Sequence, residues 1–147
     1  MIEQVGALPY RLTGSAQAVE VLLVTSRDTG RWVVPKGHLM IGKAAYEAAA
    51  IEAEEEAGVR GIVAPVPLGH FAYIKRTLGS IDVEMRVELF ALDVRETLER
   101  WKEMDQRQRR WFTAAEAAVT VDEADLGELI HRFGHGLGPR PVEAGSA

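Results

Sequence analysis

The chain has 147 residues, of which 47% are hydrophobic and 27% charged, enough apolar material for one domain with its own core. Its net charge of −5 at pH 7 argues against duplex nucleic acid as a partner, because proteins that bind it present a broad basic face. The absence of cysteine excludes disulfides and thiolate metal sites, and no apolar run is long enough to predict a membrane span. We expect a cytoplasmic protein, a monomer or homodimer, that binds no membrane.

The first elements that the sequence predicts are two strands and a helix. β-branched residues dominate 19–25, a turn sequence follows, and 32–34 is again apolar, so these segments predict a β-hairpin. A tight turn is expected over 35–38. Segment 44–57 consists largely of Ala and Glu, which favour helix, and Gly58 is a natural helix stop. Its many alanines predict close packing against a sheet.

The second half of the chain predicts further strands and two more helices. A β-like pattern over 59–73 leads to a loop over 74–80, and alternation of apolar and polar residues predicts a half-buried strand over 81–93. Thr113 and Glu116 form a capping box for a short helix, and a last helix is expected over 122–133. This order predicts the α/β class, with helices packed on a mixed sheet.

Three glutamates give the predicted helix an unusual face. Glu52, Glu55 and Glu56 stand at i, i+3 and i+4, so they share one face within about one turn. Carboxylates without His or Cys nearby suit Mg²⁺, with Mn²⁺ as the alternative. Taken alone, the triplet is more typical of a solvated acidic helix surface. The turn before the helix changes that balance, because Gly37 can bring a backbone carbonyl close to the same cation.

The segment from Gly37 to Val59 resembles the Nudix box, whose pattern is G-x5-E-x7-R-E-U-x-E-E-x-G-U with U aliphatic. The matching positions are Gly37, Glu52, Glu55, Glu56, Gly58 and Val59. Two positions depart from the pattern, because Lys43 replaces the first Glu and Ile51 replaces the Arg. The family Arg is understood to help orient the acidic residues. The change of both positions together is what we would expect if a pair of opposite charges that supports these acids had been exchanged.

The resemblance implies a Nudix-type α/β/α sandwich with a mixed β-sheet. It covers roughly residues 19–133, so we expect a single Nudix domain over 1–134 and a flexible C-terminal tail over 135–147, which is rich in Gly and Pro. The turn at Lys36, Gly37 and His38 is similar to that of diadenosine tetraphosphate hydrolases. The segments around Arg27 and Arg109 are similar to diphosphoinositol polyphosphate phosphohydrolases.

The resemblance also implies roles for individual residues. Gly37, Glu52, Glu55 and Glu56 would bind Mg²⁺, with Glu52 or Glu56 also helping to activate water. Many family members use a further acidic residue on the loop before the late Trp, and here that loop offers Asp105 first and Glu103 second. The residues predicted to bind substrate phosphates are Arg27, Lys36, His38, Lys75 and Arg109.

The hypothesis that follows is a Mg²⁺-dependent Nudix pyrophosphohydrolase whose partner is a small phosphorylated substrate. It would cleave phosphoanhydride bonds of a nucleoside-diphosphate-linked compound, with dinucleoside polyphosphates or diphosphoinositol polyphosphates as the classes considered. The alternative is a non-catalytic module that binds phosphorylated ligands through a degenerate box, which the changes at Lys43 and Ile51 favour. A decapping-type RNA hydrolase is disfavoured, because the chain lacks a broad basic patch.

Overall fold

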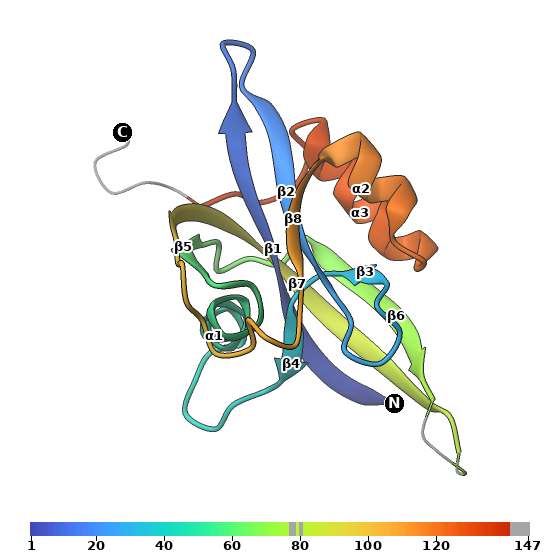
Figure 1. Cartoon of the computed structure of the whole chain (residues 1–147). Helices are drawn as coiled ribbons and strands as arrows, with labels where there is room; N and C mark the ends of the chain where they lie inside the picture. Colours follow the sequence, from blue (N-terminus) through green and yellow to red (C-terminus); the bar gives the residue numbers. More distant parts are fainter. Residues whose placement is uncertain (77–78, 80, 142–147) are drawn as a thin grey trace.

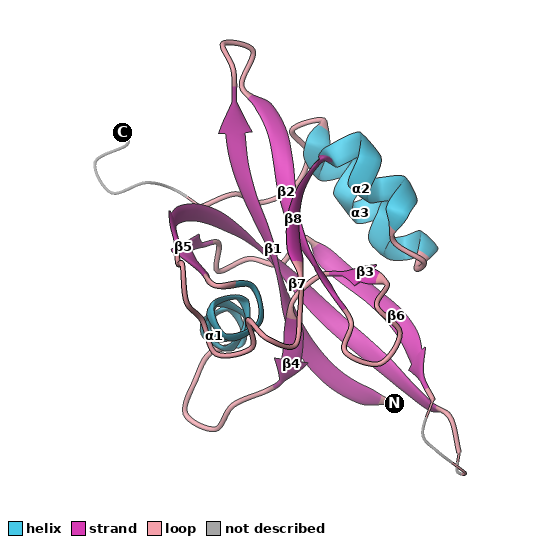
Figure 2. Cartoon of the chain, viewed as in Figure 1, coloured by secondary structure: helices cyan, strands magenta, loops and turns pink. Residues whose placement is uncertain are grey.

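The computed structural model describes residues 1–76, 79 and 81–141, which form a mixed sheet with helices on both faces (Figures 1 and 2). The strands are β1 (Ile2–Thr13), β2 (Ala18–Thr25), β3 (Trp32–Val33), β4 (Lys36–His38), β5 (Val59–Val63), β6 (Gly69–Lys75), β7 (Val83–Thr97) and β8 (Arg109–Thr113). The helices are α1 (Ala45–Ala57), α2 (Ala114–Thr120) and α3 (Ala124–Gly134). None of them is long and apolar enough to cross a membrane.

The sheet is mixed because β1 and β7, its two longest strands, pair in parallel. The order along the sheet is β3-β2-β1-β7-β5, with β4 on β1, β6 on β7 and β8 on β2, and these other pairings are antiparallel. The β2–β3 pairing confirms the predicted hairpin. The prediction of a tight turn over 35–38 was wrong, because residues 36–38 form β4 and pair with Gln4–Gly6 of β1.

Each face of the sheet has its own core, which gives the α/β/α sandwich that the sequence predicted (Figure 1). Four alanines of α1 are fully buried on one face with Phe90 and Leu92 of β7. Their small side chains let the helix lie close to the strands. Phe133 of α3 packs on the other face, where its ring contacts Tyr10 edge-on with centroids 4.9 Å apart.

The predicted alternation in β7 holds only as far as Leu89. From Val83 to Leu89 the buried and more exposed residues alternate, but the four residues 89–92 are all buried. The reason is that α1 covers the second face of the sheet from Phe90 onward, so both faces of the strand lie in a core.

β1 was not predicted from the sequence, and Pro9 explains part of the difficulty. Proline lacks a backbone N–H and is uncommon inside a central strand. Here Pro9 lies where β1 changes partner on one edge, since β4 pairs as far as Gly6 and β2 begins at Tyr10. The missing donor is therefore tolerated in a strand that otherwise runs through the middle of the sheet.

The predicted helices are confirmed, with small shifts at their ends. Gly58 ends α1 in the left-handed conformation, with φ 65° and ψ 38°. In α2 the capping box is formed, since Glu116 N donates to Thr113 Oγ1 at 3.1 Å and Thr113 N donates to the Glu116 carboxylate at 2.9 Å.

The predicted loop and the predicted flexible tail lie partly outside the described residues, which lack 77, 78 and 80 of the loop and 142–147 of the tail. Within the rest of the tail, Arg140 donates to the Phe133 carbonyl at 3.2 Å and its guanidinium lies 4.7 Å from that ring. These contacts hold residue 140 against the domain, and the boundary at 134 stays a prediction.

Candidate active site

The acidic face of α1 lies directly against β4. An atom added at the Cβ position of Gly37 would overlap the carboxyl group of Glu52, so only glycine leaves room for that side chain. The backbone N–H of Lys36 points to Glu56 Oε1 at 3.4 Å. The helix carboxylates and the backbone of β4 therefore form one wall of the site.

Glu52 and Glu56 are a closely coupled pair. Glu56 is 5% exposed, and burial raises its pKa to about 8, with a hydrogen bond to Glu52 acting in the same direction. Burial also raises the pKa of Glu52, while its hydrogen bond to Glu56 lowers it. Burial thus favours the protonated form of both groups, and a divalent cation bound beside them would favour the ionised forms.

A loop after β7 supplies the positive charge next to these carboxylates. Arg107, whose side chain is 9% exposed, lies 3.5 Å from Glu56 Oε1 and donates through Nε to Glu103 Oε1 at 3.0 Å. Lys102 Nζ contacts Glu55 Oε2 at 3.1 Å. Glu103 is thereby drawn to the carboxylates of α1, whereas Asp105 is exposed to solvent.

The donor set fits a hard divalent cation in its chemistry. It offers carboxylate oxygens beside a glycine that leaves space for them, and burial raises the pKa of both Glu52 and Glu56. In residues 1–76, 79 and 81–141 no three carboxyl or imidazole groups already converge tightly enough to enclose a metal.

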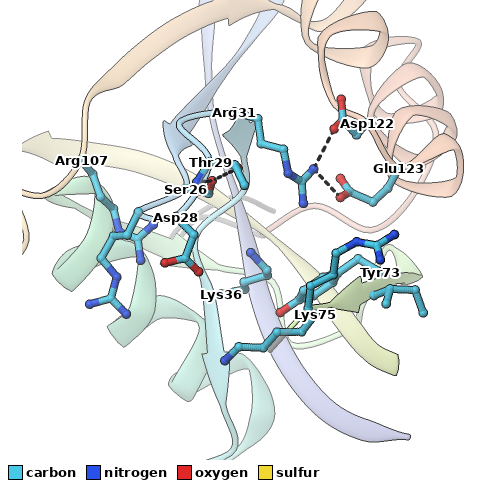
Figure 3. A pocket seen from close by; sticks show the side chains of 13 residues that line it. Ser26, Asp28, Thr29, Arg31, Lys36, Tyr73, Lys75, Arg107, Asp122 and Glu123 are labelled. Carbon is cyan, nitrogen blue, oxygen red and sulfur yellow. Dashed lines mark hydrogen bonds and ion pairs between the residues drawn. The ribbon is translucent and has the colours of Figure 1, made fainter. Parts of the chain in front are cut away.

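A cavity of about 500 Å³ opens beside this wall. Six of its lining side chains are cationic and three are acidic, in a chain whose net charge is negative. The cationic ones are Arg27, Arg31, Lys36, Lys75, Arg76 and Arg107. In Figure 3 Lys36 lies in the middle, with Arg107 on one side and Lys75 and Tyr73 on the other.

Lys36 connects the cavity to the carboxylates. Its ammonium lies 4.9 Å from the centre of the Tyr73 ring, and burial lowers the pKa of Lys36, although the charge of Glu56 opposes this. The Tyr73 hydroxyl donates to Gln4 Oε1 at 2.8 Å, and burial raises the pKa of Tyr73 to about 12. Burial therefore disfavours the charged form of both side chains.

A family model described as "NUDIX domain" matches residues 3–133. The chain belongs to the Nudix family. Nudix hydrolase 12, mitochondrial, from Arabidopsis thaliana is 36% identical over 127 residues, which are 76% of this chain and 62% of that relative. Diphosphoinositol polyphosphate phosphohydrolase 2 from Rattus norvegicus is 37% identical over 130 residues, which are 85% of this chain and 68% of the relative. The chain thus spans less than two thirds of the first relative's length.

Solved structures support the Nudix fold. The Ap4A hydrolase of C. elegans, in a binary complex, matches with a TM-score of 0.65 and 23% identity over 92% of this chain and 97% of that one. A NUDIX hydrolase from Nitrosomonas europaea matches with a TM-score of 0.69 and 19% identity over 96% and 93%. At these identities the likeness concerns the fold.

The Nudix domain brings together only some of the cations predicted to bind substrate. Arg27, Lys36 and Lys75 line the cavity, whereas His38 is exposed on β4 and is not among the residues that line it. Arg109 points elsewhere, because its guanidinium donates to the carbonyls of Ala57, Gly58 and Leu98. These contacts do not support the prediction that Arg109 binds phosphate.

Sequence reasoning missed three arginines that line the cavity, Arg31, Arg76 and Arg107. Arg31 lines the cavity and donates to Glu123 at 2.9 Å and to Asp122 at 3.2 Å (Figure 3). Arg107 lies two residues before Arg109 in a segment rich in arginine, and the sequence pattern predicted a phosphate-binding role for Arg109 alone. The signal in the sequence was that α1 contains no Lys or Arg, so a cation that balances its glutamates has to come from another element.

Each of the three tryptophans contacts another side chain of the domain. Trp32 packs edge-on against Phe112 with centroids 5.2 Å apart. The ring of Trp101 is covered by the guanidinium of Arg109 at 3.8 Å, and that of Trp111 by Arg11 at 4.1 Å.

Proposed function

We propose that the protein is a Mg²⁺-dependent pyrophosphohydrolase that cleaves a phosphoanhydride bond of a small, multiply phosphorylated substrate, with Mn²⁺ as an alternative cofactor. The observation that carries the proposal is that the carboxylates of α1 and the cationic cavity lie side by side and share residues. Lys36 and Arg107 both contact Glu56, and both line the cationic cavity. A phosphate chain held by the cavity would therefore reach the carboxylates of α1.

The residues divide into two groups by chemistry. Gly37, through its carbonyl, and Glu52, Glu55 and Glu56 are the groups proposed to hold the cation. When bound, such a cation stabilises the charge that develops on the phosphoryl group. Arg27, Lys36 and Lys75 would hold the phosphates that do not react, because their charges line the cavity.

The proposed reaction is attack of water on phosphorus, with cleavage of the anhydride P–O bond and departure of a phosphorylated product. A carboxylate accepts the proton of the attacking water, and Glu52, Glu56 or a loop acid is the candidate. Of the two loop acids, Glu103 is supported better than Asp105, because Arg107 holds it beside Glu56. Asp105 instead lines a shallow exposed depression with Arg27 and Arg107.

Dinucleoside polyphosphates and diphosphoinositol polyphosphates are the substrate classes we propose. The names of two matches support these classes, one an Ap4A hydrolase and the other a diphosphoinositol polyphosphate phosphohydrolase. The cytoplasm remains our prediction for the compartment, although several relatives are named as mitochondrial. Whether the chain is a monomer or a homodimer is likewise a prediction.

The second candidate is a module that binds phosphorylated ligands without cleaving them. The departures at Lys43 and Ile51 favour it, as does the lack of a ready-made enclosure of three acidic or imidazole groups in the described residues. Both candidates use the same cationic cavity, so only turnover separates them.

The test is product release in the presence of Mg²⁺ from diadenosine tetra-, penta- and hexaphosphate, an inositol pyrophosphate, ADP-ribose and oxidised nucleoside triphosphates. Glu56→Gln is the matched control, since it keeps the shape of the side chain and removes its charge. We expect turnover of one class and its loss in the variant. Binding of a ligand without turnover of any compound would favour the second candidate.

A further inference from the structure

The acidic face of α1 carries no counter-charge from its own helix. Residues 45–57 contain five glutamates and no Lys or Arg. Lys43, just before the helix, is exposed, and its side chain forms no ion pair within the described part of the chain. Lys43 and Ile51 therefore do not form an exchanged charged pair that supports the glutamates.

Arg107 occupies the place where such a counter-charge is needed. Its three guanidinium nitrogens contact three different acceptors, which come from α1, from the loop and from β2. Nη2 lies 3.5 Å from Glu56 Oε1, Nε donates to Glu103 Oε1 at 3.0 Å, and Nη1 donates to the Thr25 carbonyl at 3.1 Å. With its side chain 9% exposed, the guanidinium is fixed between the helix, the loop and the end of β2.

The loop that carries Arg107 is itself fastened to α1. Trp101 Nε1 donates to the Glu56 carbonyl at 3.1 Å, and Glu103 N donates to the Glu55 carbonyl at 3.0 Å. Lys102 adds an ion pair to Glu55. These contacts bring two cations from the loop to the carboxylates of the helix.

We propose that Arg107 is a positioning residue that supplies the counter-charge absent from α1 and holds Glu56 and Glu103 at a fixed separation. The inference rests on the proposed function, because it assigns Arg107 to the reaction through the carboxylates rather than through the substrate. A lysine would keep the charge but not the three directed contacts, since only the guanidinium presents donors in a planar fork.

The experiment compares Arg107→Gln and Arg107→Lys with the control Arg110→Gln. Arg110 is exposed nearby in β8, with its guanidinium 4.9 Å from the Phe112 ring. We expect Arg107→Gln to lower kcat about 10- to 100-fold, as for other groups that orient metal ligands, and to leave KM within about threefold. Arg107→Lys should recover part of kcat, and Arg110→Gln should match the wild type.

A second readout needs no turnover. Thermal unfolding is measured in EDTA and in Mg²⁺ at about pH 8.5, where the carboxyl groups are more fully ionised. Without Arg107 the clustered carboxylates repel one another until a cation binds. The gain in Tm from Mg²⁺ should therefore be about 3 °C or more larger in Arg107→Gln than in the wild type, and unchanged in Arg110→Gln.

Three results would overturn the proposal. A higher KM at unchanged kcat would make Arg107 a phosphate ligand. An equal loss of Tm with and without Mg²⁺ would make it a residue of the fold alone. Full activity of Arg107→Gln would remove it from the reaction. If the wild type hydrolyses none of the compounds tested, the proposed function fails, and the comparison of Tm gains still decides the inference.

Discussion

At the scale of single residues, the buried pair Glu52 and Glu56 makes stability depend on pH. Burial raises the pKa of Glu56 to about 8, well above the value of about 4.3 expected in the unfolded chain. Between these values the folded state binds more protons than the unfolded state, so metal-free stability is complete at low pH and falls as pH rises.

We expect the Tm of the metal-free protein to fall between about pH 5 and pH 8.5, and to fall less in Glu56→Gln, whose amide does not titrate. Thermal unfolding in EDTA measures both curves. Parallel curves for the two proteins would show that Glu56 is not the group responsible.

Gly37 gives a second prediction at this scale. An added methyl group at residue 37 would overlap the Glu52 carboxyl group and push it away from β4. We expect Gly37→Ala to lower kcat about 10- to 100-fold, since a displacement of about 1 Å in a positioned group has effects of this size. The double variant Gly37→Ala with Glu52→Asp, which shortens the acid, should recover part of the activity. Activity of the single variant equal to the wild type would contradict the proposed role of Glu52.

The carboxylates of the candidate site could be predicted from sequence, and their counter-charges could not. Helical spacing fixes the neighbours of Glu52 because the geometry of a helix is regular. The loop at 98–108 has no such period, so nothing local showed that Arg107 turns toward Glu56 while Arg109 turns toward the end of α1. The choice between Asp105 and Glu103 as the loop acid also depended on side-chain directions in this loop, which the sequence does not contain.

At the scale of elements, Arg109 joins the end of α1 to the loop that follows β7. Its guanidinium donates to the carbonyls of Ala57 and Gly58 at 3.0 and 3.2 Å and to that of Leu98 at 2.7 Å. The last carbonyls of a helix have no partner within it, so these bonds satisfy groups that would otherwise lie partly buried without a donor.

We expect Arg109→Ala to destabilise the protein by about 2 kcal/mol, the range for hydrogen bonds to a charged group, and to leave KM unchanged. Arg27→Ala, by contrast, should raise KM with little change in stability, because Arg27 is exposed and lines the cavity. Denaturant unfolding and steady-state kinetics on both variants separate the two roles. A raised KM in Arg109→Ala would restore the prediction that it binds phosphate.

The elements that sequence patterns predicted best were those with a regular period and clear ends. The helix ending at Gly58 and the helix capped by Thr113 have both features. β1 and β4 lack these features, because Pro9 breaks the sequence pattern of β1 and β4 has only three residues. β4 pairs with β1, and β1 pairs also with β2 and β7, and such pairing is a tertiary property that no short window of sequence contains.

At the scale of the whole molecule, charge is distributed unevenly. The chain carries a net charge of −5, while the cavity is lined by six cationic and three acidic side chains. An anionic substrate is then attracted locally and repelled by much of the remaining surface. Added salt screens both effects over about 10 Å at 0.1 M.

We expect KM for a polyphosphate substrate to rise several-fold between about 50 and 300 mM salt, with kcat changing little, because the exposed cations act in binding. Lys75→Gln should make this dependence shallower. The matched control Arg11→Gln, whose guanidinium lies over Trp111 and does not line the cavity, should not. A salt dependence that is the same in all three proteins would argue against the cavity as the phosphate site.

The parallel pairing of β1 with β7 also determines when the site can exist during synthesis. Ile2 pairs with Met85 and Tyr10 with Asp93, so β1 pairs with a strand that is synthesised much later. β4 in turn pairs with β1, and Arg107 follows later still. A nascent chain that has not yet reached Arg107 therefore lacks the cation that contacts Glu56 in the folded protein.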